Sequence, residues 1–387
     1  MGFELIHHRN LRVRLEVSLS VELTLINNIS RLGGGVFVGS GGIFDMYGGR
    51  IHGNTGEGNA GGVGISAWDG NLGIFTMRGG EISYNSADDE VIGGGGGVNV
   101  GGIFVMHYGK IFGNTARVGG GGLDVFGGTF TMYNGQIFDN TVAGNGWRSG
   151  GGMSVHNAGT FTMHNGEISD NTATGYGLIA GGGVFVFENG GVFLMHDGNI
   201  FNNNADGVGG GVFFGGAFTI YNGRIHRNTL NSIAGGGGGG VMIDRGTFTM
   251  FNGEISNNNA NCYGWTEGGG VLVQHQGGIF HMHGGAIAGN TVTREGGDGG
   301  NVGGGVKVVS WQGAYGILRM SGGIIHGYYD TEEGLRNSSG WNRALDVGSD
   351  AIAEHGTFND AGAFTSVGDL PTTSYTVEVA NGVLLRP

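Results

Sequence analysis

The sequence of 387 residues contains one cysteine, Cys262, and only two prolines. A single cysteine excludes an intramolecular disulfide, so no disulfide framework can hold the fold together. The shortage of proline excludes a collagen triple helix, although 93 residues are glycine. The chain also has 22 Phe and 12 Met, more apolar side chains than a disordered segment carries. The glycine therefore has to serve a different ordered fold.

Basic residues are scarce as well. Lys and Arg together number 18 against 31 Asp and Glu, so the formal net charge is −13. Nucleic-acid binding needs clustered basic side chains, and we therefore expect no nucleic-acid partner. No stretch is long and apolar enough to predict a transmembrane segment, and the N-terminal residues lack the apolar run of a signal peptide.

The most informative feature of the sequence is an internal repeat. The segment FTMHNGEISDNT at 161–172 returns nearly unchanged as FTMFNGEISNNN at 248–259. Ten such copies align on the last residue of the FTM segment, which is methionine in nine copies. These anchors are Met46, Met77, Met106, Met132, Met163, Met195, Ile220, Met250, Met282 and Met320. A repeat of 25 to 38 residues indicates a solenoid in which each copy adds one coil.

Conserved spacing within the copies predicts stacked columns of identical side chains. Gly follows each anchor by three positions and Ile by five, in all ten copies. Asn follows by eight positions in nine copies, at Asn54, Asn85, Asn114, Asn140, Asn171, Asn203, Asn228, Asn258 and Asn290. A buried amide in each coil can bond the coils above and below, so these residues predict an asparagine ladder. Asn27 lies nine residues before Val36, the spacing of the ladder asparagine in the short copies, within the coil expected at residues 1–35.

Each copy contains three short segments with strand character. GGGVFV at 181–186 and FTM at 161–163 alternate apolar and variable positions, which is typical of a strand with one buried face. The segment around the conserved Ile supplies the third strand. We therefore predict an all-β fold, a right-handed parallel β-helix of about ten to eleven three-strand coils with a C-terminal cap. Residues 1–35 are expected to form an N-terminal first coil or cap, 36–328 the β-helix repeats, and 329–387 a strand-like C-terminal cap.

The repeats resemble the GGAI and FxxN repeats of bacterial polymorphic outer-membrane proteins. They are more similar to the GGGVxV…GTFTMxGGxIxxNTA repeats of large bacterial surface proteins. The resemblance covers about residues 30–330 and implies the pectate-lyase-like right-handed β-helix. It implies no single function, because this fold carries adhesins, lyases, hydrolases and phage spikes.

Two columns of outward-pointing residues are candidate contact surfaces. The middle residue of the VxV strand is apolar in four successive copies, at Phe185, Phe213, Met242 and Leu272. If exposed, this stripe predicts a lateral interface with another rod; alternatively, the chain's own tail covers it. The residue after the anchor forms an aromatic column that includes Tyr133, His164, His196, Tyr221 and Phe251. This column could bind a sugar or a partner protein; alternatively, its rings only stack on one another and stabilise neighbouring coils.

Other candidate side chains carry weaker signals. Trp147 and Trp265 lie at matching points of two long loops, where they either contact a carbohydrate or protein or pack over the edge of the core. A metal site at His164 and His196 would need further ligands, so we predict no metal.

The positions of the carboxylates bear on whether the chain is an enzyme, because a hydrolase of this fold would need a catalytic acid and base. Asp139 and Asp170 occupy one column on adjacent rungs and could pair as acid and base or hold Ca²⁺; alternatively, they are turn residues beside the ladder. No further catalytic group converges on them in the sequence. We therefore expect no enzyme activity, no catalytic residues and no cofactor.

These observations predict a non-enzymatic extracellular or cell-surface β-solenoid that acts as a filament subunit or an adhesin-like module. Its expected partners are other copies of itself, joined end to end or laterally, or a host or surface glycan or protein. The alternative is a carbohydrate-binding or polysaccharide-degrading β-helix protein.

Overall fold

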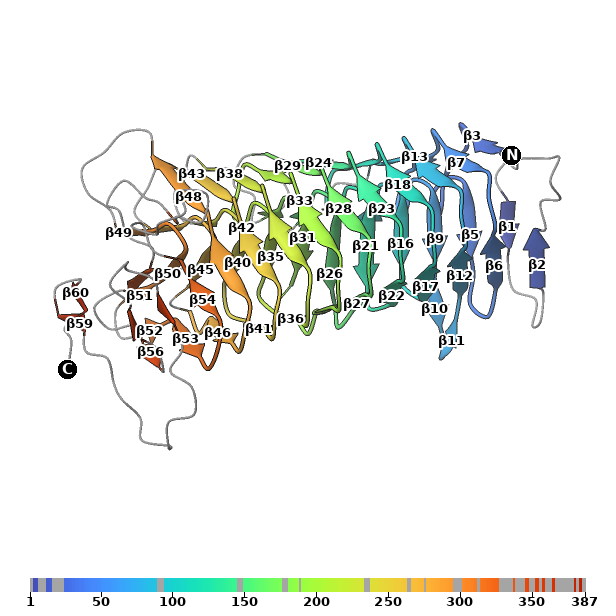
Figure 1. Ribbon diagram of the computed structural model, residues 1–387. Helices are drawn as coiled ribbons and strands as arrows, with labels where there is room; N and C mark the ends of the chain where they lie inside the picture. The colour runs from blue at the N-terminus through green and yellow to red at the C-terminus, as the bar shows by residue number, and fades with distance from the viewer. Residues whose placement is uncertain are drawn as a thin grey trace.

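The computed structural model describes residues 3–5, 12–15, 24–88, 94–144, 149–175, 180–187, 189–232, 237–262, 266–274, 276–294, 301–311 and 314–326, together with residue 337 and the short segments 345–347, 352–354, 357–358, 364–365, 379–380 and 383–384. The described residues form short strands joined by turns, and none of them is helical. The strands stack coil upon coil into an elongated rod, with the N-terminal coils at one end and the C-terminal coils at the other (Figure 1). The chain is therefore an all-β parallel β-solenoid, as the repeat predicts.

Two of the sheets that wall the solenoid come from the VxV and FTM segments. Sheet A runs in the order β1 (Phe3–Leu5), β5 (Val36–Val38), β9 (Val63–Ile65), β16 (Val98–Val100), β21 (Leu123–Phe126), β26 (Met153–His156), β31 (Val184–Val186), β35 (Val212–Phe214), β40 (Val241–Ile243), β45 (Val271–Val273), β50 (Val306–Val308) and β55 (Leu345–Val347). Sheet B runs in the order β2 (Arg12–Leu15), β6 (Ile43–Met46), β12 (Ile74–Met77), β17 (Ile103–Met106), β22 (Thr129–Met132), β27 (Thr160–Met163), β32 (Val192–Met195), β36 (Ala217–Ile220), β41 (Thr247–Met250), β46 (Ile279–Met282), β53 (Ile317–Met320) and β56 (Ile352–Glu354).

Two further sheets follow each FTM segment along the chain. Sheet C runs in the order β3 (Thr24–Ile26), β7 (Arg50–His52), β13 (Glu81–Ser83), β18 (Lys110–Phe112), β23 (Gln136–Phe138), β28 (Glu167–Ser169), β33 (Asn199–Phe201), β37 (Arg224–His226), β42 (Glu254–Ser256), β47 (Ala286–Ala288), β54 (Ile324–Ile325), β58 (Phe364–Thr365) and β57 (Thr357–Phe358), of which the last two are antiparallel. Sheet D runs in the order β4 (Ile29–Ser30), β8 (Thr55–Gly56), β14 (Ser86–Ala87), β19 (Thr115–Ala116), β24 (Thr141–Ala143), β29 (Thr172–Thr174), β34 (Asn204–Ala205), β38 (Thr229–Ser232), β43 (Asn259–Cys262) and β48 (Thr291–Arg294).

Sheet D corrects the prediction of three strands per coil. Its two to four residues directly follow the ladder asparagine and turn a small apolar side chain inward. These inward residues form their own buried row, which consists of Ala87, Ala116, Val142, Ala173, Ala205, Leu230, Ala260 and Val292. The expected number of ten to eleven coils is also corrected. A coil is complete when it has a strand in all four sheets. About eight coils, the first made of β5–β8 and the last of β40–β43, are complete and also have a complete coil on either side. The right hand of the helix stays a prediction.

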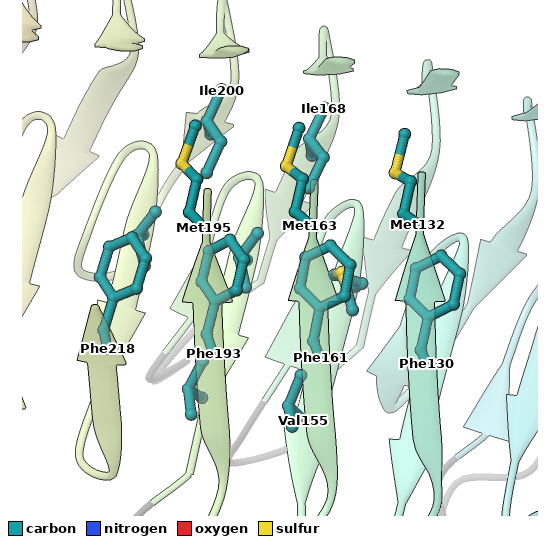
Figure 2. Close-up of a cluster of buried hydrophobic side chains, with 14 of the residues drawn as sticks. Phe130, Met132, Val155, Phe161, Met163, Ile168, Phe193, Met195, Ile200 and Phe218 are labelled. Atoms are coloured by element: carbon teal, nitrogen blue, oxygen red, sulfur yellow. The ribbon is translucent and has the colours of Figure 1, made fainter. Parts of the chain in front are cut away.

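The core is built from columns of identical residues. Phe161 pairs in register with Phe193 and Met163 with Met195, without a shift between coils. The inward phenylalanine rings lie nearly parallel, with centroids 4.6 Å apart for Phe161 and Phe193, and the neighbouring coils repeat this contact (Figure 2). All of these rings are fully buried. Each such side chain contributes roughly 1.5–3 kcal/mol of burial free energy.

The predicted asparagine ladder is present, and all nine of its predicted members are fully buried. Asn171 is representative: its Nδ2 donates to Asn203 Oδ1 at 2.9 Å and to the carbonyl of Ile137 at 3.0 Å. Its Oδ1 accepts from the backbone N–H and the Nδ2 of Asn140. Each side chain thus completes the hydrogen bonding of the neighbouring coils, in an interior where an unmade bond is costly.

The ladder extends past both ends of the predicted column. Asn28 donates to Asn54, and Asn290 donates to Asn337. Asn27, which has the ladder spacing in the sequence, instead has a φ of 54° and forms the turn before the ladder position. The prediction failed by one residue because the segment from the first ladder amide to Val36 is one residue shorter than in the next coil.

The conserved glycine three residues after each anchor has positive φ in every coil, as expected for a position that favours glycine. At Gly166, φ is 115°, and a Cβ atom would lie 2.5 Å from Met132 Cε in the preceding coil. The turn therefore requires glycine both for its conformation and for the close approach of the preceding coil, whose Gly135 carbonyl oxygen would lie 2.7 Å from the same Cβ.

Three additional kinds of strand lie outside the four walls. Glycine-rich strands form two small sheets, called the cover sheets below: β15 (Gly94–Gly95), β20 (Gly119–Gly120), β25 (Ser149–Gly150) and β30 (Ala180–Gly181) in one, and β39 (Gly237–Gly238), β44 (Thr266–Gly268) and β49 (Asn301–Gly303) in the other. Two hairpins interrupt the corner between sheets A and B, namely β10 (Ala67–Trp68) with β11 (Asn71–Leu72) and β51 (Ser310–Trp311) with β52 (Ala314–Tyr315). A third hairpin pairs β59 (Val379–Ala380) with β60 (Val383–Leu384).

Candidate functional site

The predicted apolar stripe is not an exposed surface. Phe185, Phe213, Met242 and Leu272 do stack on four successive strands of sheet A, but their exposed fractions are only 1, 4, 5 and 0 %. They form a third apolar cluster with Val309, in addition to the core and the row of sheet D, and Phe187 and Val208 pack against it. Of the two alternatives, an exposed lateral interface is therefore wrong, and the stripe is covered within the chain.

The cover sheets explain this burial. Strand β30 contacts β35, and the position of a Cβ atom on Gly181 lies 3.0 Å from the backbone nitrogen of Phe213. The same Cβ would lie 2.1 Å from the carbonyl oxygen of Val184, so only glycine allows this approach. Cover-sheet strands precede seven of the VxV strands, namely β16, β21, β26, β31, β40, β45 and β50, and lie against sheet A there, whereas no such strand precedes β35. The chain covers the stripe with its own repeat.

The outward aromatic column is a continuous stack of rings. From His107 to His283, seven rings on successive coils lie nearly parallel, with centroids 4.7 to 5.3 Å apart. Tyr133 is 46 % and Tyr221 is 44 % exposed. Because each ring face is covered by the next ring, the column presents ring edges to solvent. A sugar stacks on a ring face, so this geometry favours rung stacking over the predicted sugar platform.

His164 and His196 are neighbours in this stack, with centroids 4.9 Å apart and planes 7° from parallel. Imidazole lone pairs lie in the ring plane, so two parallel rings cannot direct them at one ion. Burial and the charge of His196 both lower the pKa of His164. Among the described residues, no group of three or more His, Cys, Asp or Glu side chains could hold a metal ion.

The Asp139 and Asp170 pair lies at a conformationally special turn. Both residues have left-handed backbones, with φ of 53° and 56°, directly before a ladder asparagine. The same left-handed position holds glycine or asparagine in most other coils, at Gly53, Gly113, Asn202, Asn257 and Gly289, and Tyr84 and Arg227 in the remaining two. Asp170 accepts a hydrogen bond from Asn202 at 3.2 Å. Burial and the charge of Asp170 raise the pKa of Asp139. The backbone conformation accounts for aspartate here without a catalytic role.

A buried polar cluster lies on the outer face of sheet A, in the column that continues into the apolar stripe. Asp124 Oδ1 accepts hydrogen bonds from Ser154 Oγ and from His156 Nε2, the latter at 2.6 Å, while Asn99 Nδ2 reaches Asp124 Oδ2 at 3.4 Å. Asp124 and Ser154 are each only 1 % exposed. This cluster was not predicted from the sequence. Asn99, Asp124 and Ser154 are nevertheless the middle residues of three successive VxV strands, and Phe185 is the middle residue of the next one.

The cluster contains the residue types of a serine hydrolase but not their order of contact. Catalysis requires the histidine to accept the serine proton, with the carboxylate on the far side of the ring. Here the serine hydroxyl and the imidazole both bind one carboxylate oxygen. The arrangement instead ties neighbouring coils together beneath the cover sheets, through hydrogen bonds that a buried charge requires.

Trp147 and Trp265 lie outside the described residues. No family model matches the sequence, and no curated protein and no solved structure matches it either. The described part of the chain contains no helix of the length and apolarity needed to cross a membrane. The fold is thus established by the coil geometry alone, and the resemblance to bacterial surface repeats stays a hypothesis.

Proposed function

We propose that the chain is a non-enzymatic structural solenoid that works outside the cell or at the cell surface as a rigid rod. One observation carries this proposal: in each repeat column, the side chains are used for contacts with their equivalents in the next coil. The amides bond each other, the inward phenylalanines stack, and the outward rings stack as well. A repeat whose side chains mainly contact the adjacent coils forms a stiff rod. Such a rod is suited to hold its two ends at a fixed distance.

The same observation argues against catalysis. A hydrolase needs a reacting group within reach of a substrate, with its acid and base on opposite sides of the bond to be cleaved. Asp139 and Asp170 lie side by side at turns that directly precede ladder asparagines, and Asp124 and Ser154 of the buried cluster are each only 1 % exposed. The proposed extracellular location rests on the resemblance of the repeats to those of bacterial surface proteins, which is itself a hypothesis.

Of the two structural roles, an adhesin-like surface module is better supported than a filament subunit. The stripe that would have joined rods laterally is buried under the cover sheets. A filament would then have to form end to end. Sedimentation velocity together with negative-stain electron microscopy of the purified chain tests this choice: single rods favour the module, and regular end-to-end polymers favour the filament.

The non-enzymatic part is tested by incubating the chain with neutral and acidic polysaccharides and measuring the release of new chain ends. We expect no release. Release that disappears in the Asp139→Asn and Asp170→Asn variants, with the circular dichroism spectrum unchanged, would establish the polysaccharide-degrading alternative.

A further inference from the structure

The same hairpin interrupts the solenoid at two places. The segment AWDGNLG at 67–73 and the segment SWQGAYG at 310–316 both follow a sheet A strand and precede a sheet B strand. Trp68 pairs with Asn71 in the first hairpin, and Trp311 pairs with Ala314 in the second. Each hairpin is closed by an equivalent hydrogen bond, from Gly73 N–H to the Ser66 carbonyl and from Gly316 N–H to the Val309 carbonyl, both 2.8 Å.

The two hairpins occupy the same corner of the rod at a defined separation (Figure 1). Sheet B passes from β12 through β17, β22, β27, β32, β36, β41 and β46 to β53, which is eight steps. At about 4.8 Å per step, the hairpins lie roughly 38 Å apart along the axis. Between β16 and β17 the same corner is only Gly101 and Gly102. Two hairpins with the same strand pairing at the same corner indicate that both have the same role.

The first hairpin projects its tryptophan into solvent. Trp68 is 70 % exposed and Leu72 is 43 % exposed. The turn residues Asp69 and Gly70 both have positive φ, 52° and 75°, which is the conformation of the two-residue hairpin turn that matches strand twist. A ring that is 70 % exposed cannot be covered on both faces. Trp68 therefore offers what the aromatic column lacks, an aromatic face open to a ligand and held by an ordered turn.

We propose that the β10–β11 hairpin is a binding finger for a neutral polysaccharide chain or surface, and that the β51–β52 hairpin, whose strands pair in the same register, is a second finger of the same kind. The apolar face of a tryptophan ring packs against the C–H face of a sugar ring, and the exposed polar side chains of Asp69 and Asn71 lie beside it for the sugar hydroxyls. The net charge of −13 opposes an acidic polysaccharide. The ligand class is therefore an uncharged glycan.

The size and spacing of the fingers favour a polymer over a protein. A stable protein interface buries about 1,200–2,000 Å² in total, which one short hairpin cannot supply. Two weak sites held at a fixed distance on a rigid rod gain affinity when one repetitive ligand occupies both. This inference goes beyond the structural role proposed above. It stands even if that role is wrong, because binding through the fingers is measured separately from cleavage and from filament formation.

Binding isotherms on microcrystalline cellulose and on chitin test the proposal, with soluble polygalacturonate as the acidic comparison. We expect the full chain to bind at least one of the two neutral polymers more tightly than polygalacturonate. Trp68→Ala and Trp311→Ala are each expected to weaken binding about tenfold or more, and the double variant to abolish avidity. Trp68→Phe should retain part of the affinity, since it keeps an aromatic face.

The matched control is Tyr108→Ala, which removes another aromatic residue, 62 % exposed, from outside the fingers. It should bind as the unmodified chain does, and all variants should keep the same thermal unfolding midpoint. Failure of the unmodified chain to bind either neutral polymer would overturn the proposal. So would binding that Trp68→Ala leaves unchanged, or a dimer in sedimentation that Trp68→Ala dissociates, because the fingers would then serve a second copy of the chain.

Discussion

At the scale of single residues, the ladder asparagines are the most demanding positions. Asn171 accepts two hydrogen bonds from Asn140 and donates to both Asn203 and Ile137, all away from water. Asparagine alone supplies this combination at this size, because it carries an acceptor and two donors on a short side chain. Aspartate would place an acceptor against two acceptors.

We expect Asn171→Ala to lower the free energy of unfolding by about 3 kcal/mol or more, since each buried group left without a partner costs roughly 1–3 kcal/mol. Asn171→Asp should be comparably damaging at neutral pH. Urea unfolding followed by circular dichroism measures both. Asn252→Ala is the control, because Asn252 is exposed and its bond to Asn222 is 3.5 Å long. Equal losses at positions 171 and 252 would refute the ladder's role.

The histidine pair in the outward stack predicts acid sensitivity. The pKa of His164 is lowered by burial and by His196, so between that pKa and the ordinary value of 6.5 the folded chain binds fewer protons than the unfolded chain. The free energy of unfolding therefore has its full value above pH 6.5 and decreases as the pH falls from 6.5 towards the pKa of His164 in the folded chain. The loss is small, because His164 remains partly exposed.

His164→Tyr, which repeats the residue found at Tyr133 and Tyr221, should reduce the drop in urea midpoint between pH 7.5 and pH 5. His196→Tyr should reduce it less, because it removes only the charge of the neighbour and leaves the burial of His164. An unchanged drop in both variants would show that acid sensitivity arises elsewhere.

At the scale of strands and sheets, the sequence predicts the strands whose apolar and variable residues alternate. It does not predict the strands that lack this alternation. The VxV, FTM and Ile segments alternate over three or more residues, and all three predicted strands are confirmed. Sheet D escaped prediction because strands such as Thr55–Gly56 are too short to alternate. The cover sheets escaped because glycine has no side chain whose pattern could reveal a buried face. The sequence therefore left open whether Phe185 is exposed or covered, while its stacking on Phe213 was predicted correctly.

Sites proved harder to predict than strands for a related reason. The columns that include Tyr133 and Asp139 were found from spacing, but spacing does not reveal whether a ring offers its face or its edge. Trp68 was missed because its hairpin lies outside the repeat. The signal was nevertheless present, as Asp-Gly between two short apolar segments is a strong hairpin pattern.

The cover sheets lead to a prediction about exposure. In Gly181→Ala, the new Cβ would overlap the carbonyl oxygen of Val184, so β30 has to move away from Phe213. We expect a loss of about 1–3 kcal/mol in stability and an increase in the fluorescence of an apolar dye as the stripe opens. Gly48→Ala is the control, because a Cβ there meets no atom within 4 Å. If both variants bind the dye equally, the cover sheets do not protect the stripe.

At the scale of the whole molecule, the rod is a sum of coils and the contacts between them. Each coil contacts mainly its two neighbours, and no disulfide connects distant parts. Stability should then depend on register and number of coils rather than on any central core. The distance between the two fingers follows from the same property, because it equals the number of coils between them times the rung spacing.

Deleting residues 164–195 removes one complete coil and joins Met163 to His196 in register. We expect this variant to fold, to keep the β spectrum of the full chain and to unfold cooperatively in urea. Deleting residues 164–179 removes about half a coil and places unlike residues above each other, so it should unfold or aggregate. Equal behaviour of the two deletions would contradict the additive coil description.

The most direct test of the account asks whether equivalent residues lie directly above each other on adjacent coils. In a Cys262→Ser background, Thr131→Cys with Thr162→Cys places two outward cysteines on paired positions of β22 and β27. Adjacent strands are about 4.8 Å apart, within disulfide reach, whereas Thr131 and Leu194 are two rungs apart and beyond it. Mass spectrometry after mild oxidation should find the disulfide in the 131/162 pair and none in the 131/194 pair. A disulfide only in the 131/194 pair, or none in either, would contradict the stacked register on which the fold, the ladder and the spacing of the fingers all depend.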